Sequence, residues 1–194
     1  MARALGCLIL TLALAACGGQ GQTKFAATDV TGADYGQDFA LTDHNGKPRT
    51  LADFRGKVVT VFFGYTQCPD VCPLSLSTMA AAMKVLGEDA KRVQVLFITI
   101  DPERDTRELL AQYVPTFNPD FIGLYGDSQT TPRVAKDFRV FYQKQPGSTP
   151  GAYTVDHSAG TYIFDPMGRL RLYAKHGEKP EALAADIKLL LAGK

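Results

Sequence analysis

The sequence is short of the residues that mark many specialised functions. Its 21 Lys and Arg residues nearly balance 20 Asp and Glu residues, for a formal net charge of +1. That balance gives no electrostatic reason to expect a nucleic-acid partner, and we predict none. Only three histidines and four cysteines are present, and there is no internal repeat or low-complexity tract. The length of 194 residues and the 45% hydrophobic content suit one globular domain.

The N-terminus has the features of an export signal. Arg3 precedes an apolar stretch at residues 4–14, which is too short to cross a bilayer as a helix. Residues 14–17, Leu-Ala-Ala-Cys, resemble a bacterial lipobox, in which a signal peptidase cuts before a cysteine that carries lipid. We therefore predict a lipoprotein signal peptide at residues 1–16 and lipidation of Cys17. The alternative is a plain secretory signal that happens to contain a cysteine.

The predicted anchor sets the expected location of the protein. Residues 17–36 would supply the lipid-anchor cysteine and a flexible linker, because they are rich in Gly, Thr and Asp and show no sustained period. Residues 37–194 would form the folded domain. Several acyl chains on one residue anchor a protein stably. The sequence thus predicts a protein of the bacterial cell envelope, lipid-anchored to the membrane, with its domain on the periplasmic or extracytoplasmic side.

Signal cleavage would also sort the four cysteines. Cys7 would leave with the signal peptide and Cys17 would carry lipid. Cys68 and Cys72 would remain, in an exported and oxidising compartment. A bridge between them would close a very small loop and add little stability. We therefore assign this pair to chemistry.

From residue 39 onward, the hydrophobic pattern predicts an α/β domain. The dipeptide Asn45-Gly46 separates two short strand-like runs, which is typical of a β-hairpin. Two apolar runs, 58–63 and 93–100, are typical of strands buried on both faces. Further strands are expected at 121–124, 161–164 and 170–174, and helices at 74–86, 106–114, 131–138 and 180–191. Residues 143–156 are expected to be irregular, because Gly and Pro interrupt them.

This order of elements predicts the fold class. A hairpin is followed by a βαβ unit and, at the end, by two strands and a helix. The layout is that of a thioredoxin-like fold, with a central mixed β-sheet flanked by helices and an N-terminal β-hairpin. Residues 101–105 are expected to cap the helix that begins near Thr106. Met79 and Met83 are expected to pack in the core.

Cys68 and Cys72 lie where the first buried strand gives way to a helix. In open α/β sheets, sites form beyond the carboxyl ends of strands, and a helix N-terminus favours the thiolate over the thiol. A thiolate is both the nucleophile of disulfide exchange and a ligand for soft metals. The spacing is Cys-x-x-x-Cys, whereas thioredoxin-like oxidoreductases use Cys-x-x-Cys. Both chemistries remain open at this point.

His157 is the third candidate residue. Taken alone, it is more typical of a hydrogen-bonded histidine at a junction of loop and strand. Beside two thiolates, its imidazole would complete a donor set that favours copper, with zinc as the competitor. Asp156 would then orient the imidazole or tune its charge. The other two histidines, His44 and His176, are expected to be exposed to solvent.

Three segments together resemble the signature of the Sco/SenC family. They are residues 64–73 (GYTQCPDVCP), 101–106 (DPERDT) and 153–158 (YTVDHS). The resemblance implies that Cys68, Cys72 and His157 bind one copper ion per chain, as Cu(I) or Cu(II).

The same resemblance implies a function. It indicates a copper metallochaperone, not an enzyme, that assists assembly of the copper centre of cytochrome c oxidase. The implied partner is subunit II of the oxidase or another periplasmic copper or thiol client.

Other functions remain open from the sequence. Some members of the family act as thiol-disulfide oxidoreductases on the copper-site cysteines of the oxidase, and such a role would use Cys68 and Cys72 as a redox-active disulfide. A redox or copper sensor is a further alternative. A peroxiredoxin-like peroxidase is disfavoured, because Tyr65 and Pro69 stand where those enzymes carry Thr or Ser before the reactive cysteine.

Overall fold

The protein is described here by a computed structural model of residues 24–194. The predicted signal peptide at residues 1–16 and the predicted lipidation site Cys17 lie outside the described residues. None of the helices within residues 24–194 is both long enough and apolar enough to cross a membrane.

A mixed β-sheet of eight strands forms the centre of the domain, in the order β1-β10-β9-β4-β5-β6-β2-β3. The two pairings β4–β5 and β5–β6 are parallel, and the other pairings in this sheet are antiparallel. The strands are β1 (Thr28–Asp29), β2 (Ala40–Asp43), β3 (Pro48–Thr50), β4 (Val58–Gly64), β5 (Val93–Thr99), β6 (Ile122–Tyr125), β9 (Thr161–Phe164) and β10 (Leu170–Ala174).

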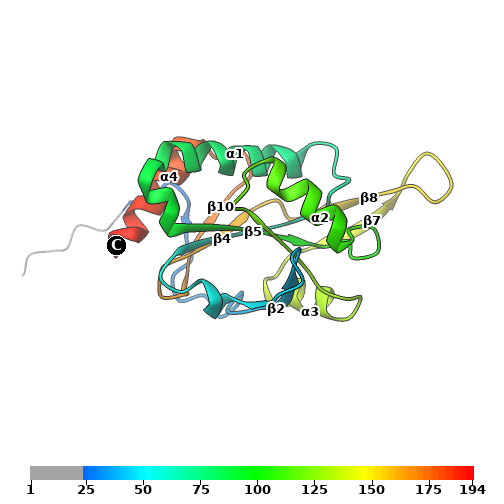
Figure 1. The fold of residues 1–194 in the computed structure, drawn as a ribbon, viewed down its shortest axis with the longest axis horizontal. Helices are drawn as coiled ribbons and strands as arrows, with labels where there is room; N and C mark the ends of the chain where they lie inside the picture. Colours follow the sequence, from blue (N-terminus) through cyan, green and yellow to red (C-terminus); the bar gives the residue numbers. More distant parts are fainter. Residues whose placement is uncertain (1–23) are drawn as a thin grey trace, which may run out of the picture.

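Helices cover both faces of this sheet (Figure 1). Helices α1, α2 and α4 lie over one face, and α3 lies over the other. Their bounds are α1 (Val71–Leu86), α2 (Arg107–Tyr113), α3 (Thr130–Asp137) and α4 (Pro180–Leu191), with short 3₁₀ turns η1 (Leu51–Phe54), η2 (Gly87–Arg92) and η3 (Val114–Thr116). The prediction of an α/β thioredoxin-like fold, with a mixed sheet between helices and an N-terminal hairpin, is confirmed.

The core lies where the sequence is most apolar. Every residue of β4 and β5 is buried, because helices pack on one face of these central strands and α3 packs on the other. Met79 and Met83 are buried on the inner face of α1, so their predicted role in core packing is confirmed.

Two predicted segments differ from the structure. The linker was expected to extend through residue 36, but Thr28 and Asp29 form the edge strand β1, paired with β10. The buried carboxylate of Asp186 accepts hydrogen bonds from the amides of Ala26 and Ala27, at 2.9 and 2.8 Å. These contacts hold the segment on the domain, and a two-residue strand is too short to show a period in the sequence.

Most of a second, two-stranded sheet lies in the segment expected to be irregular, residues 143–156, and only the residues between its strands, 147–152, are irregular. The sheet consists of β7 (Tyr142–Pro146) and β8 (Tyr153–His157), which pair antiparallel. Most residues of the two strands are polar and exposed. The sequence therefore lacks the alternation of apolar and polar residues that would predict strands. Figure 1 shows the hairpin extending away from the main sheet.

Candidate metal centre

Cys68 and Cys72 are placed by the turn from β4 into α1. Cys68 lies on the loop and is half-buried, whereas Cys72 is buried in the first turn of α1. Asp70, the residue before the helix, makes no side-chain cap. Instead, Sγ of Cys68 accepts a hydrogen bond from the amide of Cys72, at 3.4 Å. Pro73 lacks an amide hydrogen, which does no harm in the first turn of a helix.

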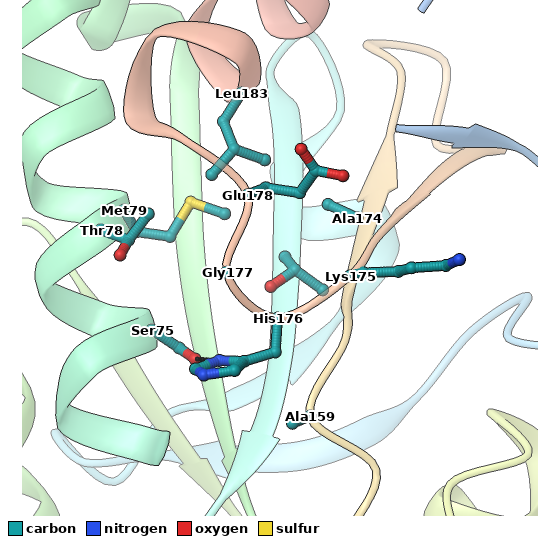
Figure 2. Close-up of a pocket in the computed structure, with 11 residues that line it drawn as sticks. Ser75, Thr78, Met79, Ala159, Ala174, Lys175, His176, Gly177, Glu178 and Leu183 are labelled. Carbon is teal, nitrogen blue, oxygen red and sulfur yellow. Dashed lines mark hydrogen bonds between the residues drawn. The ribbon is translucent and has the colours of Figure 1, made fainter. Parts of the chain in front are cut away.

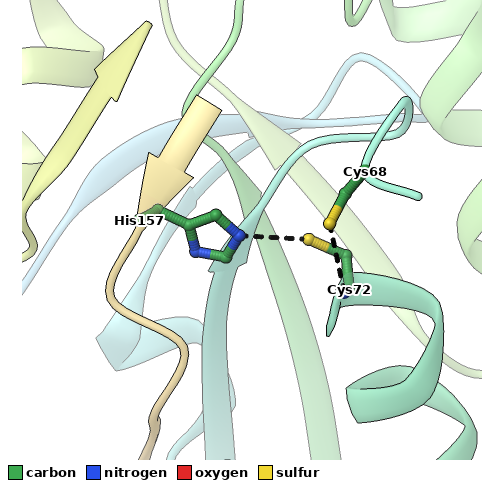
Figure 3. A group of neighbouring side chains, drawn as sticks. All are labelled: Cys68, Cys72 and His157. Atoms are coloured by element: carbon green, nitrogen blue, oxygen red, sulfur yellow. Dashed lines mark hydrogen bonds between the residues drawn. The ribbon is translucent and has the colours of Figure 1, made fainter. Parts of the chain in front are cut away.

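His157 reaches this pair from a distant part of the sequence. Nε2 of His157 lies 3.3 Å from Sγ of Cys72, although 85 positions separate the two residues. One donor atom from each of Cys68, Cys72 and His157 lies within 4.8 Å of the others. Figure 3 shows the imidazole pointing from the end of β8 toward the two sulfurs. The structure therefore brings together the three residues that the sequence singled out.

The imidazole is held by its backbone neighbour and by two aromatic rings. Nδ1 of His157 lies 2.9 Å from the carbonyl oxygen of Ser158. A carbonyl can only accept, so Nδ1 carries the hydrogen and Nε2 is left to face the sulfur of Cys72. The rings of Phe62 and Tyr65 stand edge-on to the imidazole, with centroids 6.1 and 6.0 Å away.

Asp156 does not orient the imidazole as expected. Its carboxylate accepts a hydrogen bond from Nε2 of Gln145, at 2.9 Å, on the exposed side of the hairpin. Successive residues of a strand point to opposite faces, so Asp156 and His157 point away from each other. The carbonyl of Ser158 takes the orienting role, a contact that residue types in the sequence do not indicate.

The two cysteines differ in acidity. The pKa of Cys68 is lowered to about 4, first because the Cys72 thiol donates a hydrogen bond to its sulfur; the amides of Asp70 and Cys72 also donate. The pKa of Cys72 is raised, because its thiol donates to Cys68 and because it is buried. The metal-free pair therefore holds one proton, on the buried sulfur, and exposes a thiolate at Cys68.

Asp105 fixes the loop that carries Cys68. Its buried carboxylate accepts hydrogen bonds from the amide and hydroxyl of Thr66, at 3.0 and 2.6 Å, and from the hydroxyl of Thr99, at 2.6 Å. The expected capping of α2 falls instead to Thr106, whose hydroxyl accepts from the amide of Leu109 at 3.2 Å. Sequence reasoning missed this role of Asp105, because an Asp just before a helix is also typical of a cap.

Comparison with known proteins identifies the family. Residues 27–192 match the family model described as SCO1/SenC. The chain belongs to the SCO1/SenC family. The mouse (Mus musculus) protein "Protein SCO2 homolog, mitochondrial" is 38% identical over 157 residues, which cover 80% of this chain and 62% of that protein. The chain therefore matches less than two thirds of the length of this relative.

Solved structures of other Sco proteins share the fold. ScoI from Bradyrhizobium japonicum, a structure with copper bound, is 42% identical, covers 79% of this chain and 98% of its own, and has a TM-score of 0.73. Apo Sco1 from Thermus thermophilus is 39% identical, covers 88% of this chain and 99% of its own, and has a TM-score of 0.77.

The donor set of this Sco chain suits a soft metal ion. Two sulfurs and one imidazole nitrogen are the ligands that Cu(I) and Zn²⁺ prefer. Metal–sulfur bonds are about 2.3 Å and metal–nitrogen bonds about 2.0 Å long. Donor atoms 3.3 Å apart, as in Cys72 and His157, can therefore share one ion. On binding such an ion, Cys72 would have to lose its proton.

The remaining two histidines lie outside this centre. His44 is half-buried, not exposed as expected, because its Nδ1 accepts a hydrogen bond from the amide of Gly123 at 3.1 Å; burial lowers its pKa. His176 is exposed as expected, and its ring lies beside Ser75, with Nδ1 3.2 Å from the hydroxyl oxygen (Figure 2). The cavity next to His176 measures only about 20 Å³, space for roughly one water molecule.

Proposed function

We propose that this protein binds one copper ion, Cu(I) or Cu(II), through Cys68, Cys72 and His157, and delivers it during assembly of the copper centre of cytochrome c oxidase. The observation that carries the proposal is the convergence of these three donor atoms within 4.8 Å. Two thiolates and an imidazole are a donor set that favours copper. A relative that is 42% identical, ScoI of Bradyrhizobium japonicum, was solved with copper bound.

The exposure of the site suits transfer of the ion. Cys68 is half-buried and Cys72 is buried, so an incoming ligand reaches the metal from the side of Cys68. Three protein ligands leave room for a client thiolate or imidazole to bind before the donor releases the ion. The same geometry therefore allows exchange of ligands without a free copper ion in solution.

We also propose the setting in which transfer occurs. The client is subunit II of the oxidase or another periplasmic protein with copper-binding thiols. Lipid on Cys17 holds the protein to the membrane of the bacterial cell envelope, on the periplasmic side. The support for this anchor is the sequence of residues 14–17, and the support for the client is membership of the family.

The test is an anaerobic titration of the reduced protein with Cu(I) against a competing chelator. Cys68→Ser, Cys72→Ser and His157→Ala should each weaken binding strongly, because each removes one of three ligands. His176→Ala is the control, since His176 is an exposed histidine outside the site, and it should bind as wild type does. Absence of binding by the wild type, or wild-type affinity in His157→Ala, would refute the proposal.

A second candidate function is reduction of a client disulfide. The observation that favours it is the pKa of Cys68, lowered to about 4, which makes this sulfur a thiolate at neutral pH. Cys68 would attack the client disulfide and form a mixed disulfide, with release of one client thiolate. Cys72 would then lose its proton, attack Cys68 and release the second client thiolate. The client gains two electrons, and this protein is left with a Cys68–Cys72 disulfide.

His157 separates the two functions. Disulfide exchange needs the two cysteines alone, whereas a three-ligand copper site also needs the imidazole. His157→Ala should therefore abolish tight copper binding and leave the reduction of a client peptide largely intact. A loss of both activities in a folded His157→Ala protein would contradict this separation.

A further inference from the structure

The three proposed ligands lie on two different structural elements. Cys68 and Cys72 lie on the loop and helix that follow β4, whereas His157 is the last residue of β8. Within residues 24–194, β7 and β8 pair with each other and with no strand of the main sheet. Pairing in the main sheet therefore places His157 only indirectly, through the short connection from β8 to β9, which pairs with β4.

Arg104 contacts both parts of the site. Its Nη1 donates to the carbonyl of Tyr153 at 2.9 Å and to Oε1 of Gln67 at 3.3 Å. The guanidinium also stacks on the Tyr153 ring, with Cζ 3.5 Å from the ring centroid. One side chain thus touches the residue before Cys68 and the first residue of β8.

Asp101 holds Arg104 in this position. Its carboxylate is 1% exposed and accepts hydrogen bonds from Nε of Arg104 and from the hydroxyl of Tyr153, the latter at 2.8 Å. A buried carboxylate requires such partners, because an unpaired charge in the interior is strongly unfavourable. Asp101, Arg104 and Tyr153 are called the clamp below.

The clamp reaches His157 through the geometry of β8. Alternate residues of a strand share a face, so Tyr153, Val155 and His157 point to the same side of the hairpin, and their burial follows this pattern. The amide of Val155 also donates to the hydroxyl of Tyr65, at 3.1 Å, and the ring of Tyr65 borders the imidazole. Tyr153 and Val155 therefore hold β8 at two points along the face that carries His157.

We infer that Arg104 is a positioning residue that holds His157 within bonding distance of Cys72. A guanidinium suits this role because it is planar and has several donors in a fixed arrangement, whereas the ammonium of Lys is a single charge on a flexible stem. The effect on copper rests on the proposed function, but the effect on the position of His157 does not.

A double-mutant cycle tests the effect on copper. Arg104→Met keeps an unbranched apolar stem and removes the guanidinium, and Arg104→Lys keeps a charge beside Asp101 so that the fold is preserved. Both changes should weaken Cu(I) binding by about 10-fold or more, as is usual for groups that orient a metal ligand. In a His157→Ala background, the same changes should alter affinity by less than about twofold. Equal losses in both backgrounds would overturn the inference.

Amide hydrogen exchange in the metal-free protein tests the position alone. In Arg104→Met and Arg104→Lys, the amides of β8 should exchange faster, above all that of Val155, while those of β9 in the main sheet stay protected. Unchanged protection of β8 in either folded variant would overturn the inference, even for a wild type that bound no copper. Failure of copper binding by the wild type would count against the proposed function only.

Arg49 provides a matched control. It pairs with the buried carboxylate of Asp43 at 2.8 Å and lies over the ring of Phe54, with Cζ 5.7 Å from the centroid. These contacts are of the same kind as those of the clamp, but they lie at the N-terminal hairpin. Arg49→Met should therefore leave copper affinity and β8 exchange as in wild type. An effect equal to that of Arg104→Met would show that general destabilisation explains both.

Discussion

Gly64, the last residue of β4, leaves no room for a side chain beside the sulfur of Cys72. A Cβ atom at position 64 would lie 2.7 Å from this Sγ and 2.9 Å from the rings of Phe62 and Phe97. Atoms this close would have to move apart. The end of the strand is therefore shaped around the buried sulfur, and the position of Cys72 depends on the absence of a single methyl group.

Gly64→Ala should lower both the stability of the fold and the affinity for copper. Adding a methyl group to a packed interior destabilises by about 1–3 kcal/mol, and here the nearest atom to move is a proposed ligand. Urea unfolding of the metal-free protein measures the first effect, and the Cu(I) titration measures the second. Wild-type values in both experiments would show that Cys72 is free to move, contrary to the tight packing described above.

Alkylation of the reduced protein should occur first at Cys68 and should vary little with pH. Only the thiolate reacts, and with a pKa of about 4 Cys68 is mostly ionised at pH 5 and almost completely ionised from about pH 6 to pH 8. The rate should fall only as the pH drops toward 4, because the thiolate then takes up a proton. Mass spectrometry after brief treatment with iodoacetamide identifies the modified residue, and Cys68→Ser is the control. A rate that rises tenfold per pH unit through neutrality would contradict this assignment.

Cys17→Ser should block the attachment of lipid to the protein. The sequence of residues 14–17 predicts that lipid is attached to this sulfur, and serine cannot take its place. Fractionation of cells that produce each form, with mass spectrometry of the purified proteins, measures the effect. Cys7→Ser is the matched control, because Cys7 lies within the predicted signal and should not affect anchoring. An unmodified Cys17 in soluble wild-type protein would remove the lipoprotein prediction.

Most of the main sheet could be predicted from the sequence, because its central strands are buried on both faces. The runs at β4 and β5 are mostly apolar, with Thr60, Gln94 and Thr99 as exceptions, and every residue of both strands is buried. The hairpin of β7 and β8 could not be predicted in this way. Its two strands pair with each other, and most residues of Tyr142–Pro146 are polar and exposed. The segment therefore resembles a loop in its composition.

The three proposed ligands could be predicted from the sequence, but the residues that hold them in place could not. Cys68 and Cys72 stand out because few cysteines are present, and His157 was joined to them through resemblance to a family. The contacts that hold these residues depend on where distant segments meet. Arg104 lies in a segment that suggests a helix cap, and only the folded chain shows its side chain between the cysteine loop and Tyr153.

The separate origin of the ligands has a consequence for folding. An ion bound to Cys72 and His157 closes a loop of 85 residues, and such a link restricts the unfolded chain more than the folded one. Binding to the folded state also stabilises it by mass action. The loaded protein should therefore unfold less readily than the empty one. In the proposed function, each transfer of copper to a client would remove this cross-link, so the empty donor would unfold more readily than the loaded one.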